Sequence, residues 1–562
     1  MTRNIDHKRL GRLRQGQGEI ANHIIDEFAA GRLSRRDFIR RASVVGISSP
    51  LLGSILAACS SSSSSSSSSA SGSATGAPGA VIKAGITTPG ATINPLTVSD
   101  QGGLDMLAQT GEYLTLATQQ LTLQPLLATS WSANSAADVW TFKIRQGVKF
   151  HDGSPLTADD VVYTYKQQTG PGKNSALGGV LTPAGVVKVD DYTVAFHLDA
   201  PNGNFPYLTS SDNYNMIIIP NNYNPANWQS SFIGTGPFVL GSYTPKVGAT
   251  FTRNESYWGT KALPSQTQFT FIEDPAAQVL AMTGGSIDVL GQFAVTGGEA
   301  LLSGSYNVIK LKTSAHRELS MRCDQAPFTD ARVRQAIALT LNRPEIITAL
   351  WKGYADIGND SPFAPVYPST NTSVAQRTQN ISQAKSLLAA AGHGSGFSTT
   401  LVTENIQEIP SFAQVVAQSA AAIGVTVKLS VENQSVYYGN FKFGTSPWLD
   451  STMSLVDYGH RGVPNVFLGA PLQTINATTG TGAWNAAHFS NSQYDSLVKQ
   501  YVAAPDLSSQ RSVAGQIQTL LLSETPIIYA YFYNYLTATA MGVTGVYPTA
   551  IGHLFLYNAA KS

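Results

Sequence analysis

A run of ten consecutive serines, at residues 60–69, does most to limit where this chain can fold. Small and polar residues continue to Gly79, so residues 60–79 contain no large apolar side chain that a core could bury. Residues 59–79 are therefore predicted to form a flexible tether, spanning about 25 Å root mean square by random-coil scaling. Globular structure belongs to residues 80–562, which are enough for two or three domains.

The segment before the serines has the organisation of an export signal. Two arginines in SRRDFIR (residues 34–40) precede an apolar run that glycine, serine and proline interrupt, so a stable membrane-spanning helix is the weaker interpretation. SRRDFIR resembles the twin-arginine consensus of a route that carries folded proteins. LAAC (residues 56–59) resembles a bacterial lipobox, in which the cysteine carries the lipid. We therefore expect residues 1–58 to be a twin-arginine lipoprotein signal peptide and Cys59 to be the lipid attachment site.

Charge and cysteine content limit the partners of the mature chain. Residues 1–58 hold ten Lys/Arg and five Asp/Glu, which leaves 26 basic and 30 acidic groups in the rest. This slightly acidic balance argues against a nucleic-acid partner, which would need a basic face. Besides Cys59 only Cys323 is present, so no intramolecular disulfide is expected, and folding in a reducing cytoplasm before export would lose nothing.

Hydrophobic periodicity predicts a mixed α/β protein. Strands are predicted at residues 81–87, 140–144 and 193–198, and the apolar run at residues 216–219, closed by Pro220, predicts a buried strand. A helix is predicted to begin at TADD (residues 157–160), where a hydroxyl cap precedes two acids. Later helices are predicted at residues 330–341, 382–391, 410–423, 494–502 and 508–522, with strands at 425–429 and 527–531.

Motifs for catalysis, cofactors and metals are missing from the sequence. It contains no Gly-x-Ser-x-Gly elbow, no Gly-x-Gly-x-x-Gly, no phosphate loop and no His-Glu-x-x-His. The nine histidines are scattered without ligand spacing, and Cys323 is typical of a small core residue. We expect no enzyme activity, no cofactor and no metal site, although a triad assembled from distant residues would leave no such motif.

Four stretches resemble the signatures of a single family. They are LATSWSANSAADVWTFKIRQGVKFHDGSPLTADDVVYTYK (127–166), GTGPFVLGSY with RNESYWG (234–259), PFTDARVRQAIALTLNRPEII (327–347) and QAKSLLAAAG (383–392). With EYL (112–114) and ETPIIYAYFY (524–533), the resemblance covers the chain from Val81 to its end. The sequence is similar to the bacterial extracellular solute-binding proteins of the peptide/nickel group, family 5, which serve ABC importers.

The resemblance implies a class II periplasmic-binding-protein-like α/β fold. Two lobes, the first with an extra subdomain, would close around a ligand held in the cleft between them. The implied boundaries are residues 80–116, 233–315 and 526–562 for lobe one, 117–232 for the extra subdomain and 316–525 for lobe two. Hinge segments would lie near residues 316–324 and 524–532.

In peptide-binding members of this family, an Asp-Tyr pair in a Trp-x-x-Asp-Tyr-x-Asp/Glu-Pro pattern holds the ammonium group of the ligand. The matching stretch here keeps Asp457-Tyr458 but has Ser454 in place of the tryptophan and His460-Arg461 in place of the acid and proline. A carboxylate beside a cationic group gains a charge-assisted hydrogen bond. We therefore expect Asp457 to bind an ammonium or similar cation, with an internal ion pair to Arg461 as the alternative.

The two departures suggest what holds the other end of the ligand. His460 and Arg461 supply an imidazole and a guanidinium, which suit a carboxylate or another anion. A small zwitterion held between the aspartate and the arginine would fit both ends. Aromatic side chains are expected to form stacking walls, with core packing as the alternative for each: Trp448, Tyr458 and Trp484.

These expectations combine into a lipid-anchored, monomeric receptor outside the cytoplasm. It would capture a peptide or a small peptide-like, amine-bearing solute and deliver it to the permease subunits of an ABC importer without catalysing a reaction. Three alternatives stay open. They are a nickel- or metal-chelate-binding member of the same family, a cell-envelope hydrolase, and a surface docking or sensory protein.

Overall fold

The computed structural model describes residues 79–90, 93–170, 175–224, 232–478 and 480–562. The expected signal peptide and Cys59 lie outside these residues, as does the expected tether up to Pro78. Within the described residues, no helix combines the length and the apolarity that crossing a membrane requires.

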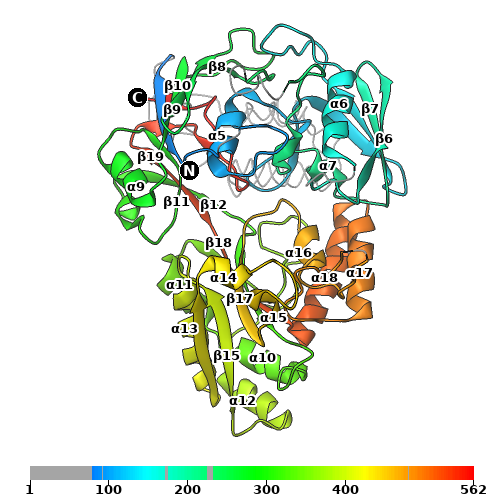
Figure 1. The fold of residues 1–562 in the computed structure, drawn as a ribbon, viewed down its shortest axis with the longest axis vertical. Helices are drawn as coiled ribbons and strands as arrows, with labels where there is room; N and C mark the ends of the chain where they lie inside the picture. Colours follow the sequence, from blue (N-terminus) through cyan, green and yellow to red (C-terminus); the bar gives the residue numbers. More distant parts are fainter. Residues whose placement is uncertain (1–78, 91–92, 171–174, 225–231, 479) are drawn as a thin grey trace, which may run out of the picture. The chain divides into compact units, whose positions relative to one another are not determined.

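The first lobe is built on a seven-stranded mixed sheet assembled from distant parts of the chain (Figure 1). The strand order is β12 (Tyr306–Leu311), β19 (Tyr535–Ala540), β11 (Val289–Phe293), β1 (Val81–Ile86), β10 (Gln266–Phe271), β9 (Gly248–Arg253) and β8 (Phe238–Thr244). β1 pairs in parallel with β10 and β11. The remaining elements of this lobe are α5 (Gln101–Thr110), α9 (Pro275–Thr283), η2 (Glu299–Leu302), β20 (Val543–Thr544), β21 (Tyr547–Pro548), β22 (Leu554–Phe555) and β23 (Ala560–Lys561).

A smaller subdomain is inserted after α5 and carries a four-stranded antiparallel sheet. Its strand order is β4 (Ala128–Ala133), β5 (Val139–Ile144), β7 (Thr193–Leu198) and β6 (Leu181–Asp190). α6 (Ala158–Gln168) packs on β6 and β7, and its predicted cap is confirmed, because the side chain of Thr157 and that of Asp160 each accept a backbone N–H. The subdomain also contains β2 (Thr115–Ala117), β3 (Leu123–Pro125), α7 (Phe205–Leu208) and η1 (Tyr214–Met216).

The second lobe is built on a six-stranded mixed sheet. Its strand order is β14 (Ala355–Ile357), β18 (Ile527–Tyr533), β13 (His316–Met321), β17 (Met453–Tyr458), β15 (Phe397–Glu404) and β16 (Val425–Glu432). α13 packs on β15 and β16, whereas α11 packs on β14 and β18. The helices are α10 (Ala331–Leu339), α11 (Arg343–Trp351), α12 (Ile381–Ala390), α13 (Ile409–Ala421), α14 (Gln434–Tyr438), α15 (Pro447–Asp450), α16 (Asn465–Gly469), α17 (Ser492–Ala503) and α18 (Leu507–Glu524).

The predicted helices of the second lobe are confirmed to within a few residues, but the strand predicted at residues 216–219 is wrong. Met216 to Ile219 are fully buried, yet they form the end of η1 and irregular chain. Their backbone donors bond to separate groups and not to a neighbouring strand: Ile218 N–H bonds Glu112 O at 2.9 Å and Ile219 N–H bonds the Thr164 hydroxyl at 3.1 Å. An apolar run closed by proline marks burial without deciding between strand and coil.

The chain passes between the two large sheets at two points. β12 leads into β13 through residues 312–315, and β18 leads into β19 through Asn534 alone. These crossings contact each other, because Thr313 donates its hydroxyl to Tyr533 O at 2.6 Å and Tyr533 N–H bonds Ala315 O at 2.9 Å. The hinge segments inferred from the sequence, near residues 316–324 and 524–532, overlap the strands β13 and β18 that the crossings join.

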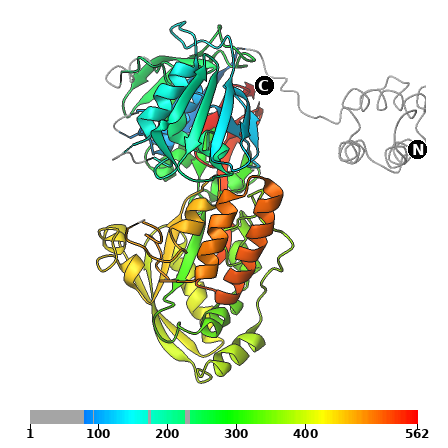
Figure 2. The same cartoon turned by 90° about the vertical axis from the view of Figure 1, so that its right-hand side faces the viewer.

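A second contact joins the smaller subdomain to the second lobe. In the side view, α17 and α18 lie below the four-stranded sheet (Figure 2). Gly203 N–H bonds Val502 O at 2.9 Å, and the Asn204 side chain bonds Asn465 and Gln510, each at 2.9 Å. A Cβ atom on Gly203 would lie 1.9 Å from Ala504 O, so only glycine permits this approach of the two backbones.

A buried ion network stabilises the second lobe. The Asp360 carboxylate, which is 1% exposed, accepts hydrogen bonds from Arg343 at 2.7 Å and from Arg377 at 2.6 Å. Both guanidiniums depend on this carboxylate, because an unpaired buried charge is costly.

We expect Asp360→Asn to lower the free energy of unfolding by about 3–5 kcal/mol, since it leaves the buried Arg343 and the mostly buried side chain of Arg377 without their counter-charge. The amide keeps the shape of the side chain and tolerates the φ of +50° at this position. Urea denaturation followed by fluorescence measures the loss. Asp330→Asn is the matched control, because it removes the exposed pair with Arg332 and keeps an N-capping side chain. Equal losses in the two variants would contradict the prediction.

Candidate ligand-binding site

Two cavities are lined by residues from both lobes. The first, of about 320 Å³, is called the crossing cavity because it lies beside the β18–β19 crossing. It is lined by Thr87, Gln101, Pro275, Gln278, Gln292, Phe293, Ala294, Val295, Trp351, Gln407, Tyr533, Asn534 and Tyr535. The second, of about 310 Å³, is called the Arg461 cavity. It is lined by Ser175, Ala176, Tyr207, Leu208, Asp212, Asn213, Tyr214, Asn215, Arg461, Gly462, Val463, Val466, Trp484 and Ile551.

Asp457 lies near the end of β17, where its side chain remains 31% exposed. The neighbouring strand β13 brings the fully buried guanidinium of Arg317 against it, and the two form an ion pair. The Tyr533 hydroxyl also donates to Asp457, at 3.1 Å. The internal partner of Asp457 is therefore Arg317, not the Arg461 that the sequence suggested as the alternative.

Arg317 is neutralised from its other side as well. Glu408 accepts two hydrogen bonds from it, at 2.8 and 3.1 Å, and the guanidinium lies 4.4 Å from the centre of the Tyr533 ring. Since one cation faces two carboxylates, the cluster has an excess negative charge. Asp457 is the more exposed of the two acids, so this charge is available to a ligand at its surface.

Gln407 sits between this cluster and the crossing cavity. Its side-chain oxygen accepts a hydrogen bond from Arg317 at 3.0 Å, and the residue itself is exposed. Its backbone φ of +46° is unusual for a residue other than glycine. Strain of this kind persists where the surroundings fix it, and it is often found at binding sites.

His460 and Arg461 are adjacent in sequence but lie in different environments. His460 is 2% exposed, and its Nδ1 accepts the Ser314 N–H at 3.0 Å. Burial, followed by the nearby positive charge of Arg461, lowers the pKa of His460 to about 3, so its ring is neutral and offers no charge to a ligand. Arg461 is exposed, lines the Arg461 cavity and donates from Nη1 to His460 O at 2.8 Å.

The three aromatic residues suggested by the sequence separate into a pair and a core residue. Tyr458 and Trp484 are half-buried and stack with ring centres 5.6 Å apart. Trp484 lines the Arg461 cavity. Trp448 is 3% exposed and packs edge-on against Tyr438, and it lines neither cavity.

Sequence reasoning missed Arg317, Gln407, Glu408 and Asp212. Arg317 and Glu408 are charged residues beside apolar elements, and burial of both would be costly unless they paired. A charged residue beside an apolar element could therefore have indicated a buried ion pair. This pattern does not identify the partner, because the two residues are 91 positions apart. Among the described residues, no group of three or more His, Cys, Asp or Glu side chains could hold a metal ion.

Comparison with known proteins identifies the family. The model of the bacterial extracellular solute-binding proteins, family 5 Middle, matches residues 122–460, which is more than half of the chain. The chain belongs to this family. Family 5 consists of extracellular solute-binding proteins.

Individual relatives of this family 5 protein differ in what they bind. A periplasmic murein peptide-binding protein of Escherichia coli is 26% identical over 486 residues, 79% of this chain and 86% of the relative. A dipeptide-binding protein of Bacillus subtilis is 24% identical over 476 residues, 78% of this chain and 84% of the relative. A nickel-binding periplasmic protein of Escherichia coli is 25% identical over 369 residues, 60% of this chain and 69% of the relative.

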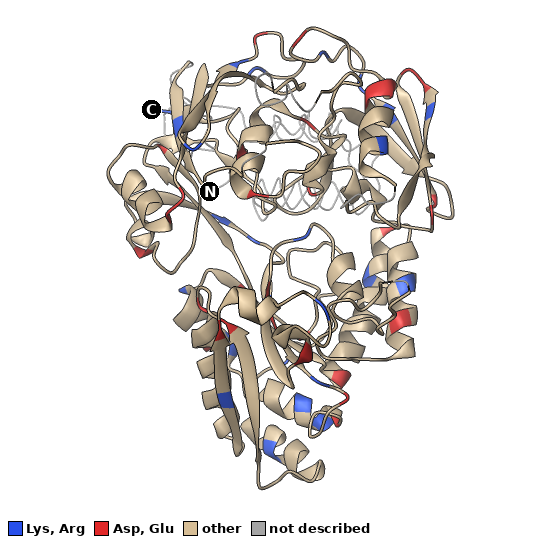
Figure 3. Ribbon diagram, viewed as in Figure 1, with Lys and Arg blue, Asp and Glu red and all other residues tan. Residues whose placement is uncertain are grey.

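Solved structures show the same two-lobed fold. The structure of HbpA2 from Haemophilus parasuis superposes with a TM-score of 0.76 at 21% identity, covering 86% of this chain and 100% of that one. Charged residues of both signs are interspersed over both lobes of the present family 5 protein (Figure 3).

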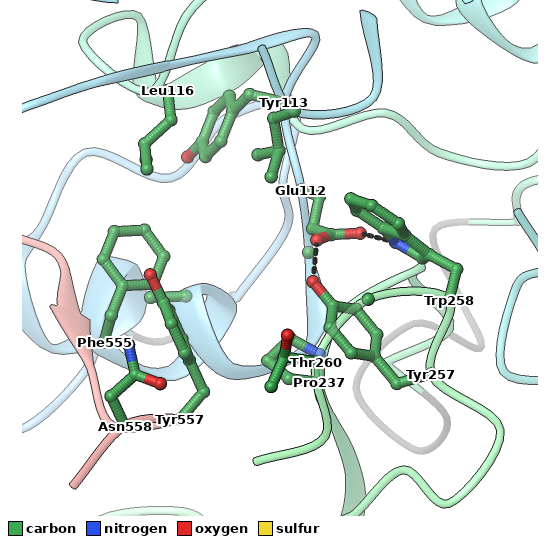
Figure 4. A pocket seen from close by; sticks show the side chains of 14 residues that line it. Glu112, Tyr113, Leu116, Pro237, Tyr257, Trp258, Thr260, Phe555, Tyr557 and Asn558 are labelled. Carbon is green, nitrogen blue, oxygen red and sulfur yellow. Dashed lines mark hydrogen bonds between the residues drawn. The ribbon is translucent and has the colours of Figure 1, made fainter. Parts of the chain in front are cut away.

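A third cavity, of about 430 Å³, lies within lobe one of this family 5 protein, away from the lobe boundary. Figure 4 shows the Glu112 carboxylate on its wall, bonded to the Tyr257 hydroxyl at 2.6 Å and to the Trp258 indole N–H at 2.8 Å. Thr235 donates a third hydrogen bond, at 2.7 Å. Burial raises the pKa of Glu112 to about 7, although these donors and Arg145 act to lower it.

Glu112 should make stability depend on pH. Because its pKa is higher in the folded chain than the ordinary 4.5, folding holds a proton that unfolding releases. The contribution is complete below about pH 4.5 and is lost as the pH rises through about 7. We expect the stability difference between the wild type and Glu112→Gln to fall by about 3 kcal/mol from pH 4 to pH 8. Urea denaturation across this range measures it, with the exposed Glu273→Gln as control; the same pH dependence in both variants would refute the assignment.

Proposed function

We propose that this protein is an extracytoplasmic receptor that captures a peptide or a small peptide-like, amine-bearing solute and delivers it to the permease of an ABC importer. The observation that carries the ligand class is the partly exposed Asp457, whose charge is in excess because Glu408 already pairs with Arg317. A carboxylate in this state gains a charge-assisted hydrogen bond from an ammonium group. The peptide-binding relatives support the same class.

In the proposed site, the ammonium group lies against Asp457 and a carboxylate of the solute pairs with the exposed guanidinium of Arg461. The stacked Tyr458 and Trp484 form an aromatic wall. Binding draws the lobes together and produces the shape that the permease recognises, and the receptor acts as a monomer. Trp448 belongs to the buried cluster on which Tyr458 and Trp484 pack, and the buried His460 accepts a hydrogen bond from Ser314 beside the crossing.

Metal chelates are the second candidate class of ligand, because the relatives include a nickel-binding protein. Purification of the chain followed by mass spectrometry of its denatured extract identifies a co-purified solute. A thermal-shift screen of peptides, amino-acid conjugates and metal chelates then ranks the classes. Stabilisation by chelates alone would overturn the peptide proposal.

We expect Asp457→Asn to abolish the thermal stabilisation that a bound peptide gives to the wild type, since the substitution removes the charge that the ammonium group needs. The amide oxygen still accepts hydrogen bonds from Arg317 and Tyr533, so the unliganded protein should stay folded.

The matched control for Asp457→Asn is Glu345→Gln, an exposed carboxylate in the first turn of α11 in the same lobe. It should respond to peptides like the wild type. An unchanged response of Asp457→Asn would remove Asp457 from the site without affecting the proposal that the protein binds a solute.

We also propose that residues 1–58 are a twin-arginine lipoprotein signal peptide, that Cys59 carries the lipid and that residues 59–79 form the tether. In this arrangement the receptor stays near its permease while it remains free to rotate. We expect Cys59→Ala to move the protein from the membrane fraction to the soluble fraction, measured by immunoblotting after cell fractionation. A wild-type chain that is already soluble would overturn the anchor.

A further inference from the structure

Asp212 is a half-buried acid, and one oxygen of its carboxylate is buried without a partner among the described residues. It lies in the loop before η1 and lines the Arg461 cavity. Its Oδ2 is buried and forms no hydrogen bond with any described residue. The residue does not cap the following helical turn, whose N-terminal cap position is Asn213 and has no side-chain bond. A local structural role therefore does not account for the carboxylate.

The opposite wall of the cavity offers no counter-charge in contact with Asp212. The nearest part of lobe two is Gly462, where a Cβ atom would lie 2.2 Å from Asp212 Oδ2, so the carboxylate packs directly on this backbone. Arg461 lines the same cavity, but it forms no hydrogen bond or ion pair with Asp212 in the described part of the chain; its Nη1 bonds His460 O. Burial alone raises the pKa of Asp212 to about 7, with no cation acting to lower it.

The rest of the cavity suits a cation. Tyr207, Tyr214 and Trp484 contribute aromatic rings to its lining, and Tyr207 and Trp484 come from opposite lobes. The faces of such rings attract ammonium and guanidinium groups, most strongly where water is excluded. The Asp212 carboxylate, which lies beside these rings and shows no ion pair among the described residues, therefore suits a cationic group of a solute.

We propose that the Arg461 cavity is a subsite for a basic group of the solute. An ammonium or guanidinium group pairs with Asp212 against the aromatic rings, while Arg461 holds a carboxylate of the same solute. This proposal rests on the proposed receptor function and narrows its ligand class. The preferred solutes are peptides or amino-acid conjugates that end in a basic residue, so that a cationic side chain lies next to a free carboxylate.

The test uses matched peptides that differ in one charge. The purified chain is offered a defined mixture of di-, tri- and tetrapeptides of alanine that end in lysine, norleucine, arginine or citrulline, and the retained peptides are quantified by mass spectrometry. We expect the wild type to retain the lysine and arginine peptides about tenfold or more over their neutral counterparts. Asp212→Asn should bring this ratio close to one and still retain the neutral peptides.

Two further variants and a melting curve test whether Asp212→Asn loses the preference for basic peptides only because the protein is destabilised. Asp212→Glu keeps the charge and should keep part of the preference, whereas Asp199→Asn, an exposed acid in the same subdomain, should match the wild type. The unliganded Asp212→Asn protein should melt no lower than the wild type at pH 8, because it loses an unpaired buried charge.

The outcomes separate the subsite from the receptor function. If the wild type retains peptides without preference for a basic end, or if Asp212→Asn keeps the preference, the subsite is refuted while the receptor function stands. If Asp212→Asn and Arg461→Gln weaken all peptides equally, Asp212 acts by pairing with Arg461 on closure, and the subsite is again refuted. If the wild type retains no peptide, the proposed function fails and the subsite fails with it.

Discussion

The cleft is organised around one buried cation, Arg317. Its guanidinium pairs with Glu408 and Asp457 and packs on the ring of Tyr533, so segments far apart in the sequence meet at it. A guanidinium in the core is tolerated because its donors and its charge are satisfied. Two carboxylates carry one more negative charge than the single guanidinium can neutralise. The excess charge lies on Asp457, which is partly exposed. The charge offered to a solute is thus a consequence of how the core of lobe two is neutralised.

This cluster lies where the lobes are joined. Arg317 is the second residue of β13, directly after the crossing at residues 312–315, and Tyr533 is the last residue of β18, directly before Asn534. In the proposed site, a solute bound at Asp457 acts on the two segments that connect the sheets, which is where a small change at the ligand can alter the angle between lobes. The hydrogen bond from Gly203 to Val502 joins the smaller subdomain to the second lobe, away from the two crossings. Any closing motion has to preserve or replace this bond.

The regular elements were predictable because their signals are local. The cap at Thr157 and the helices of lobe two are set by neighbours a few residues away. Which sheet a strand joins is not a local property. β18 is buried on both faces, so its sequence fits the middle of either sheet, and the crossing at Asn534 falls beyond the inferred hinge. Asp457 carried a motif, whereas Arg317 lies 140 positions away in sequence and carried none.

Residues 460 and 461 show why neighbours in a motif need not share a role. In the extended chain after β17 one side chain enters the core and the other faces solvent, so His460 is a neutral acceptor and Arg461 a free cation. Asp212 was invisible to sequence reasoning for a different reason. Glu408 and Asp457 are explained by their shared partner Arg317, whereas the Oδ2 of Asp212 has no partner among the described residues. A receptor that binds through charge must keep one such interaction incomplete until its solute arrives, and the unpaired acid then specifies the charge that the solute has to bring.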